Sequence, residues 1–446
     1  ELLSGQFPLW DPHLGFGQPA APDPNRGLFF LPTLLTRLLL PEVLGFNLCV
    51  ALPFPLLALG MYAFLRRHVS RPAAAFGSVA FVLSGPSISM GNFLNFPWAF
   101  AFVPWALYAA DLLVERVTPQ RFAGLAATFA MLFLGGESVT LLTGSALTVL
   151  YAALGASGDA PSKVRLRGAL VVVVAGLVAV LLAAIQVLPL SETIGLSLRS
   201  FDANQRIHRF WSLHPVTLVE TIVPQAFGNP VSPFGAAGLW IKALNAGREP
   251  FMLSIYLGVG VLGLALLGAG ATRPRRVALF WVGVSAVILV AALGDYLPVY
   301  PFAQRVIPLL GSIRYPSKYT IFLALAVASL GALGWEAMAR GFADDARRTA
   351  LGVVVWALAG LGFVALALTL WGAAAPGSLQ AAAMPFATAL CPTGPSEAAA
   401  YLSRTVLLAG PRFLALALAA AACIWFGAVG MDPRPRGLLF ALVLLD

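Results

Sequence analysis

Charged residues are scarce in this chain. They make up 11% of its 446 residues, whereas a soluble domain carries about 25%. So few charges cannot cover a surface that faces water, which excludes a soluble globular enzyme and a disordered chain. Cysteines are also few: Cys49, Cys391 and Cys423 lie far apart without a metal-binding spacing. We therefore expect no structural disulfide and exclude a disulfide-rich secreted module. P-loop, Rossmann and HExxH motifs are absent as well.

Apolar residues are abundant instead. Residues of the AVILMFWYC set make up 59% of the chain, and the mean hydropathy is +0.85. This composition predicts an all-α polytopic transmembrane helical bundle. The net charge of +9 does not indicate nucleic-acid binding, because the basic residues form short clusters between apolar stretches. Such clusters report membrane topology.

Long apolar runs fill most of the sequence. A membrane-spanning helix needs about 20 mostly apolar residues, and we predict about eleven complete spans with a partial one from residue 437. Gly135-Gly136-Glu137 interrupts the run 121–155, which is too long for one crossing, so we predict a helical hairpin there. The predicted spans are 45–65, 72–88, 97–114, 121–135, 138–155, 168–190, 251–271, 276–294, 318–339, 349–372 and 411–429.

The loops between these spans form two sets. The short loops hold most of the 28 Lys and Arg residues, which predicts that they are cytoplasmic. The long loops therefore face outward, and we expect the site there, since loops on a rigid scaffold usually carry function. The short loops are 66–71, 115–121, 156–167, 272–275, 340–348 and 430–436. The long ones are 1–44, 89–96, the turn at 136, 191–250, 295–317 and 373–410.

The chain begins with Glu1 and stops at Asp446, inside an apolar run. We expect a fragment in which 1–44 is an N-terminally truncated first outer loop, preceded by a membrane helix. Residues 45–446 then form the transmembrane bundle.

Several motifs give a family resemblance. Residues 8–12 read PLWDP, residues 27–32 read GLFFLP, residues 211–215 read WSLHP, and residues 314–318 read RYPSK. Their order and loop placement resemble the YfhO family of bacterial membrane proteins. One departure is Gly135-Gly136-Glu137-Ser138, where many relatives carry a Gly-His-Pro-Gln-like turn.

The resemblance implies a GT-C-like glycosyltransferase in the bacterial inner membrane. Such an enzyme moves a sugar from a polyprenyl-phosphate-linked donor to a cell-envelope acceptor at the outer face. The lipid bilayer, the donor and the acceptor are the expected partners. A divalent cation is a possible cofactor, although this sequence holds no metal motif. The alternatives are a transporter or flippase of lipid-linked precursors and a non-catalytic membrane scaffold.

Two carboxylates are candidates for catalysis. A GT-C enzyme needs an acid in its first outer loop to deprotonate or orient the acceptor hydroxyl. Asp11 is the nearest carboxylate in that loop, and the alternative is that it caps a turn before Pro12. Glu137 lies at an outer interhelical turn, where it could contact acceptor or cation, or cap the helix from Ser138.

The donor phosphate would need cations on the outer side. Arg314 and Lys318 precede a membrane helix and run against the positive-inside trend. They could bind a lipid-linked phosphate or snorkel to lipid headgroups.

The loop 191–250 supplies further candidates for binding the donor. Arg206, His208 and Arg209 could bind phosphate or sugar hydroxyls, with Trp211 stacking on a sugar ring. The alternative is an interfacial helix with an aromatic anchor. Glu220 could pair with these arginines.

Four other polar residues are expected to have structural roles. Asp111 and Glu115 lie near a cytoplasmic helix end and are predicted to be surface residues. Glu336 and Gln186 lie in apolar runs, where we expect each to pair within the bundle.

Overall fold

The computed structural model describes residues 7–13, 16–155, 161–196, 210–232, 234–307, 310, 314–341, 345–429 and 434–445. This part of the chain is mostly helical, and its only strands are the two-residue β1 (Trp10–Asp11) and β2 (Gln18–Pro19). They form an antiparallel pair. The predicted all-α class is confirmed. The chain forms two compact units.

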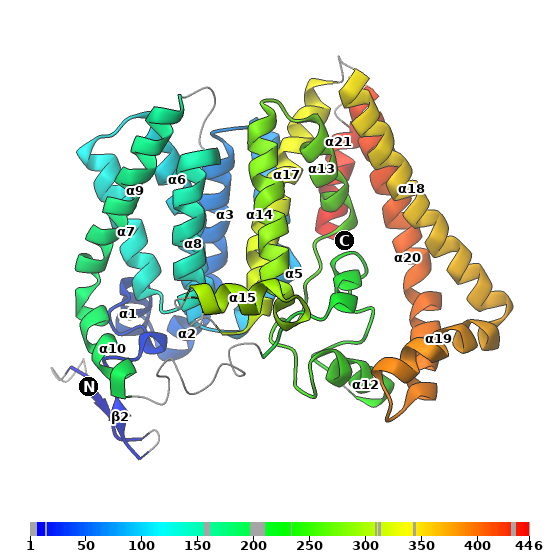
Figure 1. Cartoon of the computed structure of the whole chain (residues 1–446), viewed down its shortest axis with the longest axis horizontal. Coiled ribbons are helices and arrows are strands. Elements are labelled where there is room, and N and C mark those ends of the chain that lie inside the picture. The colour runs from blue at the N-terminus through cyan, green and yellow to red at the C-terminus, as the bar shows by residue number, and fades with distance from the viewer. Residues whose placement is uncertain are drawn as a thin grey trace. The chain divides into compact units, whose positions relative to one another are not determined.

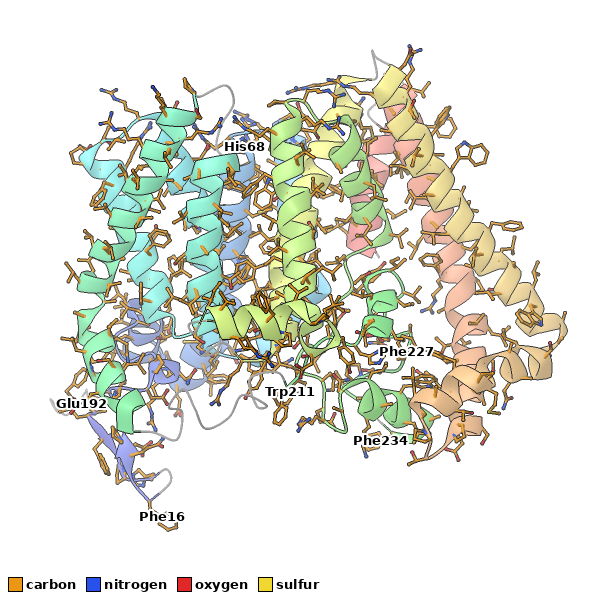
Figure 2. All side chains as sticks on the ribbon, viewed as in Figure 1. Phe16, His68, Glu192, Trp211, Phe227 and Phe234 are labelled. Carbon is orange, nitrogen blue, oxygen red and sulfur yellow. The ribbon has the colours of Figure 1, made fainter. Side chains whose placement is uncertain are left out.

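Unit 1 comprises Glu1–His68, Met90–His208 and Gly311–Ile313. Long helices run side by side in it, with α3 packed on α6 and α7 packed on α9 (Figure 1). Figure 2 places His68 at one end of these helices and Phe16 and Glu192 at the other. Besides the strands, its elements are η2 (Pro24–Arg26), α1 (Leu31–Leu39), α2 (Glu42–Ala51), α3 (Pro53–Leu65), η3 (Met90–Asn92), α6 (Asn95–Glu115), α7 (Pro119–Leu134), α8 (Ser138–Leu150), the π-helical η4 (Tyr151–Gly155), α9 (Ser162–Leu182) and α10 (Ala184–Leu196).

Unit 2 comprises Val69–Ser89, Arg209–Leu310 and Arg314–Asp446. The most buried of its long helices is α17, which packs against α13, α14 and α4. A hairpin of α18 and α20 completes the bundle, and α19 joins the two at one end. The elements are α4 (Arg71–Val82), α5 (Gly85–Ser89), η5 (Pro215–Thr221), α12 (Gly235–Leu244), α13 (Val259–Ala271), α14 (Arg275–Leu293), η6 (Gly294–Tyr296), α15 (Val299–Val306), η7 (Pro316–Tyr319), α17 (Thr320–Arg340), α18 (Asp345–Ala374), α19 (Pro376–Leu390), α20 (Pro395–Val429) and α21 (Arg434–Leu445).

Eight helices in the described part are long and apolar enough to cross a membrane. The predicted hairpin at Gly135–Glu137 is confirmed, since α7 ends at Leu134 and α8 begins at Ser138. Gly136 adopts φ 78°, and a Cβ atom there would collide with the Pro24 carbonyl. A turn that packs this closely against the Pro24 carbonyl requires glycine, because glycine has no Cβ atom and readily adopts a positive φ.

Three of the eleven predicted spans have no counterpart among these eight helices. The span 121–135 corresponds to α7, which has only 16 residues and is shorter than a full crossing needs. The span 72–88 is divided into α4 and a short helical segment, bent by 47°. The prediction of a helix over 251–271 is wrong for its first part, because α13 begins only at Val259. Gly258 has φ 88°, and the backbone before it bonds to the α5 region: Gly85 N–H donates to Tyr256 O at 2.7 Å. The backbone of this segment therefore pairs with another segment instead of forming helical hydrogen bonds.

Candidate functional site

The clearest candidate site lies at the start of α17, where Arg314 precedes η7 and Lys318 lies within it. Tyr315 precedes η7 with φ 68°, a left-handed conformation that is rare for a bulky residue. A second such residue, Trp211 with φ 57°, lies beside it, and its carbonyl accepts a 3.0 Å hydrogen bond from Ser317 N–H. Two strained backbones in contact are typical of functional sites.

Three aromatic rings form a cluster here. The Trp211 and Tyr315 centroids lie 4.6 Å apart in an edge-to-face arrangement, and Phe251 lies 5.9 Å from Trp211 and 5.3 Å from Tyr315. The Trp211 indole donates its N–H to the Glu249 carbonyl at 2.5 Å, which fixes the ring. Trp211 is half-buried, so part of its surface stays accessible.

The chain after Trp211 is held by the end of α14. Asp295 N–H donates to Ser212 Oγ at 3.0 Å, and Leu213 N–H donates to Ala292 O at 2.8 Å. Gly294 has φ 52°, and a Cβ atom there would collide with the Ser212 side chain. These contacts connect the predicted loops 191–250 and 295–317 at one place.

The site is cationic. Lys318 Nζ lies 5.2 Å from the Phe251 ring centroid and 5.4 Å from that of Tyr315, within cation–π range. Arg314 makes no hydrogen bond or ion pair with the described part of the chain, and it is half-exposed. The Ser317 hydroxyl is buried, with no hydrogen-bond partner among the described residues. Together with the N-terminal end of a long helix, these groups suit an anion.

Glu220 lies in the same unit, on η5. Its carboxylate accepts a 3.1 Å hydrogen bond from Phe227 N–H. Burial raises its pKa to about 7, and the bond from Phe227 opposes the rise. The neighbouring Thr221 carbonyl accepts from Leu257 N–H, which ties η5 to the segment that carries Phe251. A carboxyl with such a pKa can exchange a proton at neutral pH.

Asp11 belongs to unit 1 and has two partners. Its Oδ2 atom forms a 2.6 Å ion pair with Arg26, and its Oδ1 atom accepts from His13 N–H at 2.8 Å. The Arg26 hydrogen bond is the main cause that lowers the Asp11 pKa. The predicted turn-capping role is therefore confirmed, and a lowered pKa makes this carboxylate a weaker base.

Glu137 caps α8, which confirms that alternative. Its Oε2 atom accepts from Thr140 N–H at 2.6 Å, and the side chain is buried. The adjacent Gly136 carbonyl accepts from the Asn95 amide at 3.2 Å, and the same amide donates to Asn25 at 2.7 Å. The first loop thus rests on the turn that carries Glu137, and both predicted carboxylates lie at one end of unit 1.

A buried polar network lies at the opposite end of unit 1. Asp111 has no exposed surface, so the prediction of a surface residue is wrong for it. It pairs with Arg67 at 2.8 Å and accepts from the Tyr151 hydroxyl at 3.1 Å, and that hydroxyl lies 2.7 Å from His68 Nε2. Burial is the main cause that lowers the His68 pKa. The sequence did not reveal this cluster, because its members lie far apart along the chain.

The other expected pairings are confirmed. Glu336 accepts from Ser70 N–H at 2.9 Å and pairs with Arg340 at 3.0 Å. Gln186 donates to the carbonyls of Ala21 and Pro22 at 3.1 and 3.0 Å.

Three predicted residues, Arg206, His208 and Arg209, lie outside the described residues. Within the described ranges, no group of three or more His, Cys, Asp or Glu side chains could hold a metal ion. No protein-family model, curated protein or solved structure matches the chain. The resemblance to the YfhO family therefore stays a prediction.

Proposed function

We propose that this chain is a multi-pass membrane glycosyltransferase of GT-C-like architecture in the bacterial inner membrane. It transfers a sugar from a polyprenyl-phosphate-linked donor to a cell-envelope acceptor at the outer face. Eight long apolar helices support the membrane placement, and the motifs from residue 8 to residue 318 support the reaction class.

The observation that carries the proposal is the cationic, aromatic site at the start of α17. Arg314 has no acidic partner in the described chain and lies four residues from Lys318. A phosphate suits this pair, because a guanidinium binds two of its oxygens and an ammonium adds a point charge. The rings of Trp211 and Phe251 offer apolar faces to the sugar or to the first part of the lipid.

The distribution of basic residues supports an outward orientation. In unit 2, α14 begins at Arg275 and runs toward Gly294, beside the candidate site. The helix α17 runs from that site to Arg340. Arg275 and Arg340 therefore mark the end away from the site. By the positive-inside rule that end is cytoplasmic, and the site faces outward.

The proposed reaction is a displacement at the anomeric carbon of the donor sugar. The acceptor hydroxyl oxygen forms the new bond while the bond from the anomeric carbon to the phosphate oxygen breaks. The acceptor proton passes to a carboxylate. We assign this role to Glu220, because the hydrogen bond from Leu257 N–H to Thr221 O joins its helix η5 to the segment that carries Phe251, and burial raises its pKa to about 7. The lipid phosphate leaves with its negative charge held by Arg314 and Lys318. Asp11 and Glu137 hold the first loop and its neighbouring turn.

One observation favours transport of a lipid-linked precursor as a second candidate function. The bent α4 and α5 pair and the extended segment before α13 enclose a cavity of about 220 Å³, which Ser84, Ser254 and Tyr256 help to line. Interrupted helices that face irregular backbone are typical of transporter binding sites.

Sugar transfer in proteoliposomes distinguishes these functions. The protein is reconstituted with a polyprenyl-phosphate donor carrying a radioactive sugar and with membrane-extracted acceptors. A transferase moves label to the acceptor, whereas a flippase only changes the leaflet from which the donor can be oxidised by an impermeant reagent. Movement of donor without transfer would replace our proposal by transport, and neither activity would favour the scaffold.

A further inference from the structure

One side of α9 in unit 1 joins two cations to a long apolar surface. The residues of this side recur at alternating intervals of four and three, so they lie in one line along the helix. All of them are exposed, and the exposed fractions of the apolar ones lie between 50% and 74%. In chain order they are Lys163, Arg167, Leu170, Val174, Leu177 and Leu181. We call this line of residues the α9 stripe.

The opposite side of α9 fixes the rotation of the helix. It carries small residues, which let helices approach closely in a membrane, and it packs on α7 and α6. Val172, Ala175 and Ala179 have no exposed surface. A Cβ atom at Gly168 would collide with the Val114 side chain of α6. The α9 stripe therefore points away from the helices that α9 packs on, and in a membrane it contacts lipid.

The two cations of the α9 stripe lie at one membrane surface. The helix α9 begins at the same end of unit 1 as His68 (Figures 1 and 2). Most described basic residues of unit 1 lie at this end, and the exceptions are Arg26 and Arg37. By the positive-inside rule this end is cytoplasmic. Arg167 immediately precedes the predicted span 168–190, so the cations lie at the level of the lipid headgroups.

Both cations are available to a ligand. Lys163 and Arg167 make no hydrogen bond or ion pair with the described part of the chain. The basic residue between them behaves differently, since Arg165 donates from Nε to the Ala153 carbonyl at 3.2 Å. Two unpaired cations one helical turn apart repel each other, and an anion that contacts both removes this repulsion.

The apolar part of the stripe matches the depth of one leaflet. Half of a hydrocarbon core of about 30 Å is about 15 Å, which corresponds to about ten residues of helix at 1.5 Å each. An acyl chain that descends from a phosphate at Arg167 would therefore pass Leu170 and Val174 and end near Leu177. The phosphate then lies at the membrane surface and the chain points to the bilayer centre, as in any lipid of the cytoplasmic leaflet.

We infer that the α9 stripe binds an anionic phospholipid of the cytoplasmic leaflet, with its phosphate on Lys163 and Arg167 and one acyl chain along the apolar residues. The guanidinium can bind two phosphate oxygens, and the ammonium adds a point charge. A zwitterionic lipid fits less well, because its own cationic group opposes the pair. The inference rests on the membrane placement of the proposed function but does not depend on sugar transfer, whose donor phosphate is assigned to the outer face.

Native mass spectrometry of the purified, delipidated chain tests the headgroup. Phosphatidylglycerol and phosphatidylcholine with identical acyl chains are added at equal concentration, and the wild type should retain more phosphatidylglycerol. Lys163→Gln and Arg167→Gln should each lower this preference about fivefold, as expected for one basic residue at an anionic surface, and the double variant about 25-fold. Arg116→Gln is the matched control, because it removes an exposed cation from the loop after α6 at the same end of unit 1; it should leave the preference unchanged.

Photocrosslinking tests the position of the acyl chain. Phosphatidylglycerol with a diazirine on one acyl chain should label peptides within 163–181 of the reconstituted protein. Unlabelled phosphatidylglycerol should compete for this labelling and phosphatidylcholine should not, and the labelling should fall in the double variant.

Equal retention of the two phospholipids by the wild type would overturn the inference, as would an unchanged preference in the double variant. Labels confined to other helices would also overturn it, and so would labelling of 163–181 that a polyprenyl phosphate suppresses better than phosphatidylglycerol does. Sugar transfer without phospholipid selectivity would count only against this inference. Selective retention without sugar transfer would count only against the proposed function.

Discussion

Replacement of Arg314 by alanine is the sharpest test of the donor-phosphate site. The side chain is half-exposed and unpaired within the described chain, so its removal leaves no buried partner unsatisfied. We expect unfolding free energy to change by no more than about 0.5 kcal/mol, as for ordinary surface substitutions. Activity should respond very differently, because the guanidinium is proposed to bind the leaving phosphate.

The magnitude follows from the contacts that are lost. Hydrogen bonds to charged groups contribute about 1.5–3 kcal/mol each. A guanidinium can donate two, and partial exposure favours the lower value, so the loss is about 3 kcal/mol. Since about 1.4 kcal/mol corresponds to a tenfold change in rate, transfer should slow by about a hundredfold. Lys318→Ala should have a smaller effect, because an ammonium makes a less directional contact.

The assay is single-turnover sugar transfer in proteoliposomes with matched protein amounts. Arg305→Ala serves as the control, since Arg305 is an exposed cation at the end of α15 in the same unit. Arg314→Lys keeps the charge but loses the bidentate geometry and should recover only part of the rate. Transfer by Arg314→Ala at the wild-type rate would refute the phosphate role.

Three further predictions concern pH, stability and topology. Because Glu220 has a pKa of about 7, its base form increases as pH rises, so transfer should accelerate up to about pH 7 and then level off; a Glu220→Gln variant with an unchanged pH profile would exclude this role. Asp111→Ala removes the buried partner of Arg67 and of the Tyr151 hydroxyl, while Glu115 still pairs with Arg67 at 3.3 Å; it should cost about 2 kcal/mol of unfolding free energy, measured by chemical denaturation, with wild-type stability as the contradicting result. An impermeant thiol reagent should label a cysteine at Ser232 but not one at Ser162 in intact cells, and equal labelling would disprove the topology.

Local sequence determined most of the helical architecture. Apolar runs of about 20 residues located the long helices, because such a run can satisfy its backbone only by forming a helix in an apolar environment. The Gly135–Glu137 turn was also predictable, since a paired glycine interrupts the run. Arg314 and Lys318 were found because two cations stand before an apolar run, against the charge trend.

The tertiary structure alone decided which distant residues meet. Phe251 is adjacent to Trp211 and Tyr315 because the chain before Gly258 is extended, although hydropathy favours helix there. Asp111 looked like a surface residue because its helix ends nearby, yet Arg67 and Tyr151 enclose it. Periodicity reports the surroundings of one helix, whereas a hydrogen bond between two helices depends on how both are packed. Packing also made Asp11 and Glu137 capping groups and raised the pKa of Glu220, because burial and hydrogen-bond partners set the acidity of a carboxylate.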